Sequence, residues 1–463
     1  MRILTAIAAA VLLAAPVAGI AQAQTASEYN AAGFTHYSEK RLPDAIDSFD
    51  KALKLDPASL TIRSNLATAC HGYSILLSKS GDLERAIDLE RRAFELDGGN
   101  QGIRTQLALY YNDLGRRVAL TGSVSRARSL MSEAMQLLPR NLVLVTNMCA
   151  LLVMESRELL KNGNDSKAGQ LLDEAAGLDP GNIAVHVALG EFHYGRNDYA
   201  RSIASLERAL ELNPAETNVA SRLEQIRKES AVEKGFIKND RYRFAIRYED
   251  GVNEELSWNV SGILNDAYRE IGQKLGFWPS RQLTAIIYSQ DQFKAVTSAP
   301  DWTAGRFDGK LRIRITDFTR QADALTRVVR HEYAHALIFD LYGSTVPVWI
   351  NEGFAQYAAS ESGVSDDEAR ILGGAGLDRL PAPWNLGDHF ASTNGASVAL
   401  AYLESRLFMQ YMFNRYGNHT TRLFILASTK EPDLGAITHN MFNQSPEQLM
   451  ADWIADLRRK TAP

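Results

Sequence analysis

Residues 330–357 read RHEYAHALIFDLYGSTVPVWINEGFAQY and set two histidines and two glutamates within an apolar helical pattern. The spacing predicts a helix over residues 320–342 that ends at Gly343. On such a helix His331 and His335, four residues apart, share one face with β-carbons about 6 Å apart. That geometry allows both imidazoles to bind one metal ion.

A catalytic zinc site has three protein ligands and keeps a fourth position for water. Residues 343–347 predict a turn, and residues 349–357 predict a second helix that returns along the first. This return brings Glu352 towards the histidines as the third ligand. Glu332 follows His331 directly and is suited to act as general base. We therefore predict one Zn²⁺ per chain.

The motif His331-Glu332-x-x-His335, followed by residues 349–355 (WINEGFA), resembles the gluzincin metallopeptidases. It is most similar to the peptidase-MA-like domains of exported bacterial proteins, relatives of the aminopeptidase-N and thermolysin families. The resemblance covers residues 240–458. It implies an α+β zincin-like fold, zinc-dependent peptide hydrolysis, metal ligands at His331, His335 and Glu352, and water activation by Glu332.

Peptidases of this kind use a downstream tyrosine to stabilise the oxyanion. Residues 401–417 offer Tyr402, Tyr411 and Tyr416, of which we predict Tyr402, although an aromatic at helical spacing is also typical of a core residue. Three other histidines fit surface or core positions better than a metal site, namely His389, His419 and His439.

The chain differs from the aminopeptidase-N relatives in the segment that binds the free amine of their substrates. Those enzymes bind it with the glutamate of a GxMEN motif, whereas this chain has Gly-Arg-Phe-Asp-Gly at residues 305–309. Exopeptidase action from the amino end is therefore not expected. An edge strand at residues 310–316 could instead pair with an extended peptide main chain.

Strand and helix patterns alternate between residues 240 and 316. Alternating apolar residues predict strands at 242–248, 283–289 and 310–316, and helical spacing predicts a helix at 256–275. In the third strand Leu311 and Ile313 share one side, while Arg312 and Arg314 share the other. We interpret the arginine side as a solvated edge face rather than a substrate clamp.

The N-terminal part of the chain repeats itself, and its first unit, residues 26–57, resembles a tetratricopeptide repeat. A pattern of small, bulky, small and Pro or Gly residues recurs five times, at Ala45-Phe49-Ala52-Pro57, Ala86-Glu90-Ala93-Gly98, Ala127-Met131-Ala134-Pro139, Ala168-Leu172-Ala175-Pro180 and Ser202-Leu206-Ala209-Pro214. Three intervals are 41 residues and the last is 34, so three units carry seven extra residues, almost two helical turns. Glu90 replaces a bulky apolar residue, which predicts looser packing in its unit.

Such an array either offers a groove to a peptide or protein partner or acts as a stalk or lid for the next domain, and the pattern does not separate these roles. We place the array at residues 24–214. A capping helix and linker follow at residues 215–239, and the peptidase-like domain at residues 240–458.

Composition excludes some partners. The chain has 463 residues, 45% of them apolar and 23% charged, with a formal net charge of -5. It lacks the basic field that nucleic acid or an anionic membrane would attract. Its two cysteines, Cys70 and Cys149, are expected to be buried thiols rather than a disulfide.

Residues 1–23 combine Arg2, an apolar stretch and an Ala-Gln-Ala end, which predicts a cleaved export signal. A retained membrane anchor is the weaker alternative, because Pro16 and Gly19 shorten the apolar run. No later segment of the sequence is apolar enough to span a membrane. We expect an exported protein, periplasmic or secreted, with no membrane span in the mature chain.

Together these patterns predict an α+β multidomain protein in which a helical tetratricopeptide superhelix precedes a zincin-like domain. The predicted function is zinc-dependent hydrolysis of peptide or protein substrates, with the repeats binding a peptide or a protein partner. The alternative is a catalytically silent peptidase-fold scaffold whose repeats carry the function.

Overall fold

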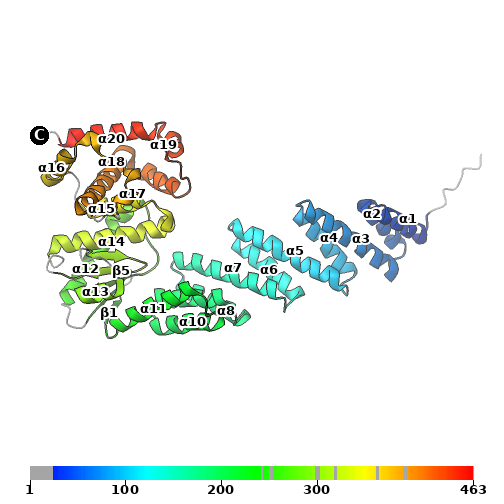
Figure 1. The fold of residues 1–463 in the computed structure, drawn as a ribbon. Helices are drawn as coiled ribbons and strands as arrows, with labels where there is room; N and C mark the ends of the chain where they lie inside the picture. The colour runs from blue at the N-terminus through cyan, green and yellow to red at the C-terminus, as the bar shows by residue number, and fades with distance from the viewer. Residues whose placement is uncertain are drawn as a thin grey trace, which may run out of the picture. The chain divides into compact units, whose positions relative to one another are not determined.

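A computed structural model of the chain describes residues 24–240, 243–249, 254–297, 303–316, 321–360, 364–390, 392 and 394–461. The described residues divide into two compact units, one that ends at Leu151 and one that begins at Leu152 (Figure 1). The predicted export signal lies outside the described residues, as does Tyr242 of the first predicted strand.

The N-terminal unit consists of helices that pack as successive antiparallel pairs. They are α1 (Ala26–Ser38), α2 (Leu42–Leu55), α3 (Leu60–Lys79), α4 (Leu83–Leu96), α5 (Gln101–Leu120), α6 (Val124–Leu137) and the first part of α7 (Leu142–Lys161). The small residues of the repeat pattern, such as Ala45 and Ala86, are fully buried where the helices meet. The helical repeat array is thus as predicted.

The seven extra residues of the lengthened units lie in the first helix of each pair. Helices α3, α5 and α7 each have 20 residues, whereas α1 has 13, and the second helices α2, α4 and α6 have 14. Seven residues are almost two full turns, so the apolar stripe continues on the same face after the insertion.

The expectation of loose packing around Glu90 is wrong. In the first repeat Gly33 lies tightly against Phe49, with no room for a β-carbon. One period later, Ser74 and Glu90 take their places, and Glu90 is fully buried. Its carboxylate accepts hydrogen bonds from the Ser74 hydroxyl and from His71 Nδ1, the latter at 2.7 Å. The van der Waals contact of Gly33 with Phe49 is thus replaced, one period later, by a hydrogen bond between Ser74 and Glu90.

The C-terminal unit begins with further helices of the array and continues into a sheet. Its helices α8 (Asp165–Leu178), α9 (Ile183–Gly195), α10 (Tyr199–Leu212) and α11 (Thr217–Val232) pack in sequence order. The described part of the sheet has five strands in the order β1-β2-β3-β5-β4, namely β1 (Ile237–Asp240), β2 (Phe244–Tyr248), β3 (Leu283–Tyr288), β5 (Leu311–Arg314) and β4 (Gly305–Phe307). The two inner pairings are parallel and the two outer ones antiparallel.

Both faces of this sheet are covered. On one face Ala285 and Leu311 join the core beneath α12 (Glu254–Leu275) and α14 (Ala322–Tyr342). On the other face Ile286 and Tyr288 pack against α13 (Gln290–Thr297) and the residues that follow α11. Strands β2, β3 and β5 are therefore buried along their whole length, whereas the edge strands β1 and β4 are partly exposed.

The remaining helices pack around α18 (Gly395–Ser428), which is kinked at Gly417. Helix α15 (Val348–Ala359) lies between α14 and α18. The others are α16 (Asp366–Ala375), α17 (Gly387–Phe390), α19 (Leu434–Phe442) and α20 (Pro446–Thr461). Trp453 of α20 is fully buried in the same core as the apolar side of α14.

Both cysteines are buried as thiols, as predicted, and burial raises the pKa of Cys70 to about 11. None of the described helices is both long and apolar enough to cross a membrane.

Candidate metal centre

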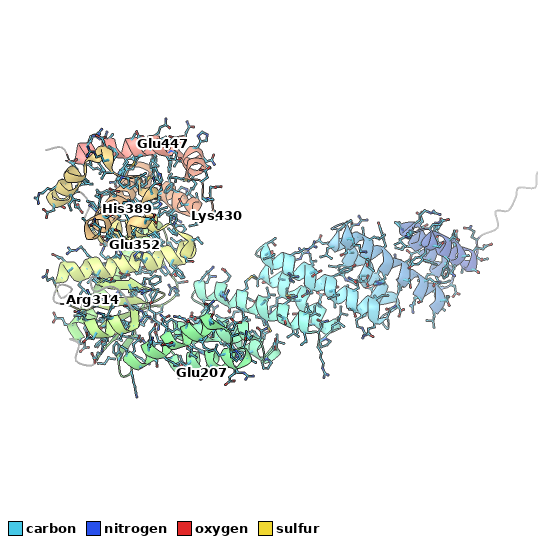
Figure 2. The ribbon with its side chains drawn as sticks, viewed as in Figure 1. Glu207, Arg314, Glu352, His389, Lys430 and Glu447 are labelled. Atoms are coloured by element: carbon cyan, nitrogen blue, oxygen red, sulfur yellow. The ribbon has the colours of Figure 1, made fainter. Side chains whose placement is uncertain are left out.

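Helices α14 and α15 bring three potential ligands together. Helix α14 carries His331 and His335 on one face and ends at Gly343, whose φ of 76° suits a residue without a side chain. A short 3-10 turn, Gly343–Thr345, then reverses the chain, and α15 begins after Pro347. Glu352, in the second turn of α15, lies beside α14 (Figure 2).

The three candidate ligand atoms lie at separations close to those of a tetrahedral zinc site. His335 Nε2 lies 3.0 Å from His331 Nε2, and Glu352 Oε2 lies 3.5 Å and 3.6 Å from the Nε2 atoms of His331 and His335. A tetrahedral zinc ion with bonds of about 2.0–2.1 Å holds its ligand atoms about 3.3–3.4 Å apart. The observed separations lie on either side of that value.

Two details of the surroundings fit a bound cation. Glu352 Oε2 is buried and has no hydrogen-bond partner among the described residues, although it faces both imidazoles. A buried carboxylate oxygen without a partner destabilises the folded protein unless it binds a cation or accepts a hydrogen bond. In addition, His335 Nδ1 lies 2.9 Å from Asn351 Oδ1. A proton on Nδ1 donated to this amide oxygen leaves the Nε2 lone pair directed at the ligand cluster.

Burial and mutual charge shift the pKa values of these groups. Burial lowers the pKa of His335, which favours the neutral, metal-binding imidazole. Burial opposes ionisation of Glu352, but its interactions with His331 and His335 outweigh this and hold its pKa below the usual range. For His331 burial is opposed by the interaction with Glu352, and the pKa is raised.

Glu332 lies next to the ligand cluster in a confined position. It is 5% exposed, and a β-carbon at Gly305 of β4 would lie 2.6 Å from its carboxyl group. Only glycine fits there. Burial raises the pKa of Glu332 to about 7, while the backbone N–H of Phe307 acts in the opposite direction. A carboxyl group with a pKa near neutrality can both take up and release a proton at physiological pH.

Clefts open on both sides of the ligand cluster. The larger one has a volume of about 1000 Å³ and is lined by His331 and Glu332, by residues 303–305 at the start of β4, and by a mainly apolar wall from α14, α15 and α18. A smaller one, of about 450 Å³, is lined by His335, Asn351, Asp308 and Phe339 among others. The cluster thus borders two clefts, His331 the larger one and His335 the smaller one.

Tyr402 lines the larger cleft together with His331 and Glu332. Burial and the negative charges of Glu352 and Glu332 raise its pKa, which keeps the phenol protonated. The two alternatives lie elsewhere. Tyr411 is 4% exposed within the core, and the Tyr416 hydroxyl donates to Gln444.

The lone histidines are not brought to the cluster. His389 Nδ1 lies 2.9 Å from the Ser397 hydroxyl, and His419 and His439 are exposed.

The prediction that residues 310–316 form an edge strand is wrong. Strand β5 lies between β3 and β4, and the three-residue β4 forms the edge. The N–H of Arg314 donates to Ala304 O, and the N–H of Asp308 donates to Lys310 O. By strand alternation the backbone groups of Gly305 and Phe307 point away from β5. Main-chain groups of β4, not of β5, are thus available beside Glu332.

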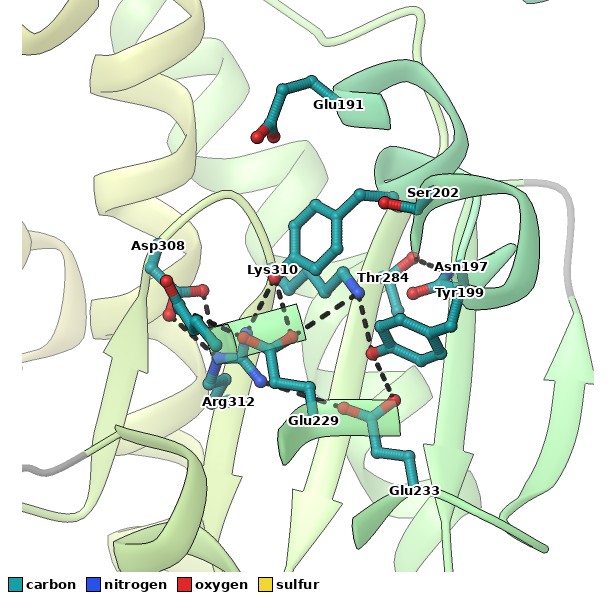
Figure 3. A network of polar contacts seen from close by, with 12 residues as sticks. Glu191, Asn197, Tyr199, Ser202, Glu229, Glu233, Thr284, Asp308, Lys310 and Arg312 are labelled. Carbon is teal, nitrogen blue, oxygen red and sulfur yellow. Dashed lines mark hydrogen bonds and ion pairs between the residues drawn. The ribbon is translucent and has the colours of Figure 1, made fainter. Parts of the chain in front are cut away.

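The prediction of a solvated arginine face is also wrong. Arg312 is fully buried, because the last array helices cover this face of the sheet (Figure 3). Its guanidinium forms ion pairs of 2.9 Å with Glu229 of α11 and with Asp308, and donates to the hydroxyl groups of Tyr288 and Tyr194 at 2.7 Å and 3.0 Å. The alternation of the strand is as predicted, but its polar side meets carboxylates rather than water.

Lys310 extends the same network. Its Nζ donates to the Tyr199 hydroxyl at 2.9 Å and lies 3.8 Å from the centre of the Tyr194 ring. The Tyr199 hydroxyl in turn donates to Glu233 at 2.7 Å. Burial outweighs the nearby carboxylates and lowers the pKa of Lys310 to about 7. The network joins α9, α10 and α11 to the hairpin whose turn residue Asp308 lines the smaller cleft.

Comparison with known proteins identifies the repeats. Residues 159–226 match the family model of the tetratricopeptide repeat, so tetratricopeptide repeats are present in the N-terminal region. Among curated proteins none matches the chain.

The similar solved structures are also repeat proteins. One is a thermophilic TPR protein from Thermus thermophilus, with 20% identity, coverage of 44% of this chain and 98% of that one, and a TM-score of 0.20. A TPR repeats protein from Bacteroides fragilis has 13% identity, coverage of 44% and 97%, and a TM-score of 0.31. YrrB, described as a TPR protein with an unusual peptide-binding site, has 15% identity, coverage of 43% and 92%, and a TM-score of 0.23.

Proposed function

We propose that this chain is a zinc-dependent peptidase of the gluzincin type whose tetratricopeptide array binds peptides or a protein partner. The observation that carries the proposal is the cluster of His331, His335 and Glu352, with ligand atoms 3.0 to 3.6 Å apart and Glu332 beside them. These three residues would hold one Zn²⁺ per chain. Zinc bound there supplies a Lewis acid that polarises a peptide carbonyl and acidifies water.

The protein's own groups have separate tasks in this reaction. Glu332, with a pKa of about 7, takes the proton of the attacking water and passes it to the leaving amine. Tyr402, kept protonated, donates a hydrogen bond to the oxyanion that develops on the substrate carbonyl. Asn351 holds His335 in the tautomer that the site needs.

The substrate backbone has a place beside these groups. The outward backbone groups of Gly305 and the carbonyl of Phe307 can pair with an extended peptide, as strand addition requires, while the Phe307 N–H is bonded to Glu332. A peptide bound along β4 would have one side chain in the larger, mainly apolar cleft. The proposal therefore assigns recognition of the main chain to β4 rather than to β5.

The repeats support a role in protein interaction. Residues 159–226 match the tetratricopeptide family model, and arrays of such repeats expose extended surfaces that bind peptides or partner proteins. We assign the array to the delivery of a peptide or to the docking of a protein partner.

A second candidate is a catalytically silent scaffold whose repeats carry the function. The observation that favours it is that the family match covers the repeats, at residues 159–226. Both candidates predict bound zinc, so the metal alone does not distinguish them.

Hydrolysis by the wild type and by Glu332→Gln distinguishes the two candidates. The zinc-loaded full chain is incubated with casein and with a peptide library, and fragments are read by mass spectrometry. The peptidase proposal predicts cleavage by the wild type and loss of at least about 10³-fold in rate for Glu332→Gln with zinc retained. Glu431→Gln, the same change at an exposed position of this unit, should cleave as the wild type does. Equal cleavage by wild type and Glu332→Gln would refute the proposal.

Export is a separate proposal. We assign residues 1–23 to a signal that is removed on transport to the periplasm or the medium. Mass spectrometry of the protein from the periplasmic fraction should find Gln24 at the amino end. Protein that stays in the cytoplasm with an intact amino terminus would contradict this assignment.

A further inference from the structure

The larger cleft carries a charged side chain that the proposed reaction does not use. Arg327 lies one helical turn before His331 on α14, so both face the same side of the helix. It lines the cleft together with His331, Glu332 and Tyr402. Its side chain is exposed and therefore free to meet a molecule that enters from solvent.

Arg327 has no acidic partner among the described residues. Among the described residues that line the cleft, the charged ones apart from His331 are Arg327 and Glu332, and the rest of the wall is largely small or apolar, as at Ala324, Val328 and Ala399. Within the part of the chain that the structure describes, Arg327 forms neither an ion pair nor a hydrogen bond. By contrast, Arg330 on the same helix pairs with Glu270 at 2.7 Å.

An unpaired guanidinium at the edge of an apolar cleft favours an anionic group, and the anion that peptides carry is a carboxylate. We propose that Arg327 is a specificity-determining residue that binds a substrate carboxylate one or two residues from the bond that is cleaved. The β-carbons of Arg327 and His331 are about 6 Å apart, and an extended peptide advances about 3.3–3.6 Å per residue. The inference rests on the proposed peptidase function and names its substrate class.

This assignment agrees with the rest of the cleft. Of the two charged side chains Arg327 and Glu332 in this wall, Glu332 is 5% exposed and Arg327 is exposed, so the charge that an entering molecule meets is positive. The carboxylate has two possible sources, the carboxyl terminus of a peptide or an Asp or Glu side chain. The first would make the enzyme release short C-terminal fragments, and the second would make it cut beside acidic residues.

Matched peptides separate these sources. The zinc-loaded full chain is given peptide pairs that differ only in Glu against Gln near the cleaved bond, or only in a free against an amidated carboxyl terminus. We expect kcat/KM to be about tenfold higher for the carboxylate member of one pair. Arg327→Gln should lose that tenfold preference and leave the uncharged peptide within about twofold. Arg415→Gln, a change at an exposed arginine of α18 outside both clefts, should keep the preference.

A binding measurement makes the test independent of turnover. In the zinc-loaded Glu332→Gln background, fluorescence anisotropy gives the Kd of the same labelled peptides with Arg327 or with Arg327→Gln. If Arg327→Gln raises the Kd of the carboxylate peptide about tenfold and leaves that of the uncharged peptide unchanged, the inference is supported. This holds even if the wild type cleaves nothing and the peptidase proposal fails. Identical carboxylate preference in both proteins, or no preference in either, overturns it.

Discussion

Asn351 acts on the proposed metal centre through a single hydrogen bond. It precedes the ligand Glu352 on α15, and its amide oxygen lies 2.9 Å from His335 Nδ1. This contact orients the imidazole, with Nε2 3.0 Å from Nε2 of His331, and a proton on Nδ1 would leave Nε2 free to bind a metal. In the proposed centre, Glu352 is thus a candidate ligand, and the residue before it would position a second one, His335.

Replacing Asn351 by alanine should weaken zinc binding without removing a ligand. The loss of a hydrogen-bond acceptor behind a ligating histidine costs about 10–100-fold in metal affinity. Titration of the apoprotein with zinc against a competing chelator measures this change. Asn351→Asp retains the acceptor and should stay closer to the wild type. Unchanged affinity in Asn351→Ala would mean that His335 is held by packing alone.

Glu404 is a buried carboxyl group that the site does not use. It is fully buried in α18, neither oxygen has a hydrogen-bond partner among the described residues, and burial raises its pKa to about 8. Since the folded pKa exceeds the unfolded one, the folded state binds the proton more tightly. Stability should therefore fall as pH rises from about 4.5 to about 8.

The Glu404→Gln variant tests this. Its free energy of unfolding should equal that of the wild type near pH 4.5 and exceed it by about 2 to 4 kcal/mol above pH 8. Urea unfolding of both proteins across this pH range gives the difference. A constant difference at all pH values would show that Glu404 does not titrate in this window.

At the scale of elements, β5 joins the array helices to the sheet through Arg312. Its guanidinium lies among Glu229, Glu233 and Asp308. Arg312→Met leaves these carboxylates buried without their cation, so we expect a loss of about 3–5 kcal/mol in the free energy of unfolding. Arg306→Met, an exposed change at the cross-strand neighbour on β4, should cost no more than about 1 kcal/mol. Denaturant unfolding compares the two, and equal losses would contradict a special role for Arg312.

Local periodicity is what made much of the fold predictable. The alternation of β2, β3 and β5 and the helical spacing of α12, α14 and α15 depend on near neighbours in the sequence, and their bounds agree with prediction to within a few residues. The convergence of Glu352 on the two histidines was also foreseeable, because a short turn between two helices restricts where the second helix can go.

The features that were missed depend on contacts distant in sequence. Whether the arginine side of β5 faces water is decided by α9 and α11, more than 70 residues earlier. Strand β4 has only three residues, too few for any alternation to be recognised. Glu90 and Ser74 complement each other across two helices, so neither residue alone indicates a tight contact. Arg327 belongs to no recognised sequence motif, so only the structure shows that it lines the larger cleft.

At the scale of the whole molecule, the chain combines tetratricopeptide repeats with a potential metal centre that lies within the C-terminal unit. All three candidate ligands come from α14 and α15, and both clefts beside them are lined by residues of the same unit. The last array helices belong to this unit as well and are joined to its sheet by buried ion pairs. We therefore expect metal binding to be a property of the C-terminal unit.

The zinc content of the purified full chain is the measurement that decides whether the proposed metal centre exists. Protein produced with ample zinc and passed through a desalting column should retain one zinc per chain by elemental analysis. His335→Ala and Glu352→Gln should each fall well below one, while His389→Ala, at a histidine outside the ligand cluster, should keep the full amount. A wild-type protein without metal, or ligand variants that bind zinc as fully as the wild type, would contradict the metal centre and the function proposed from it.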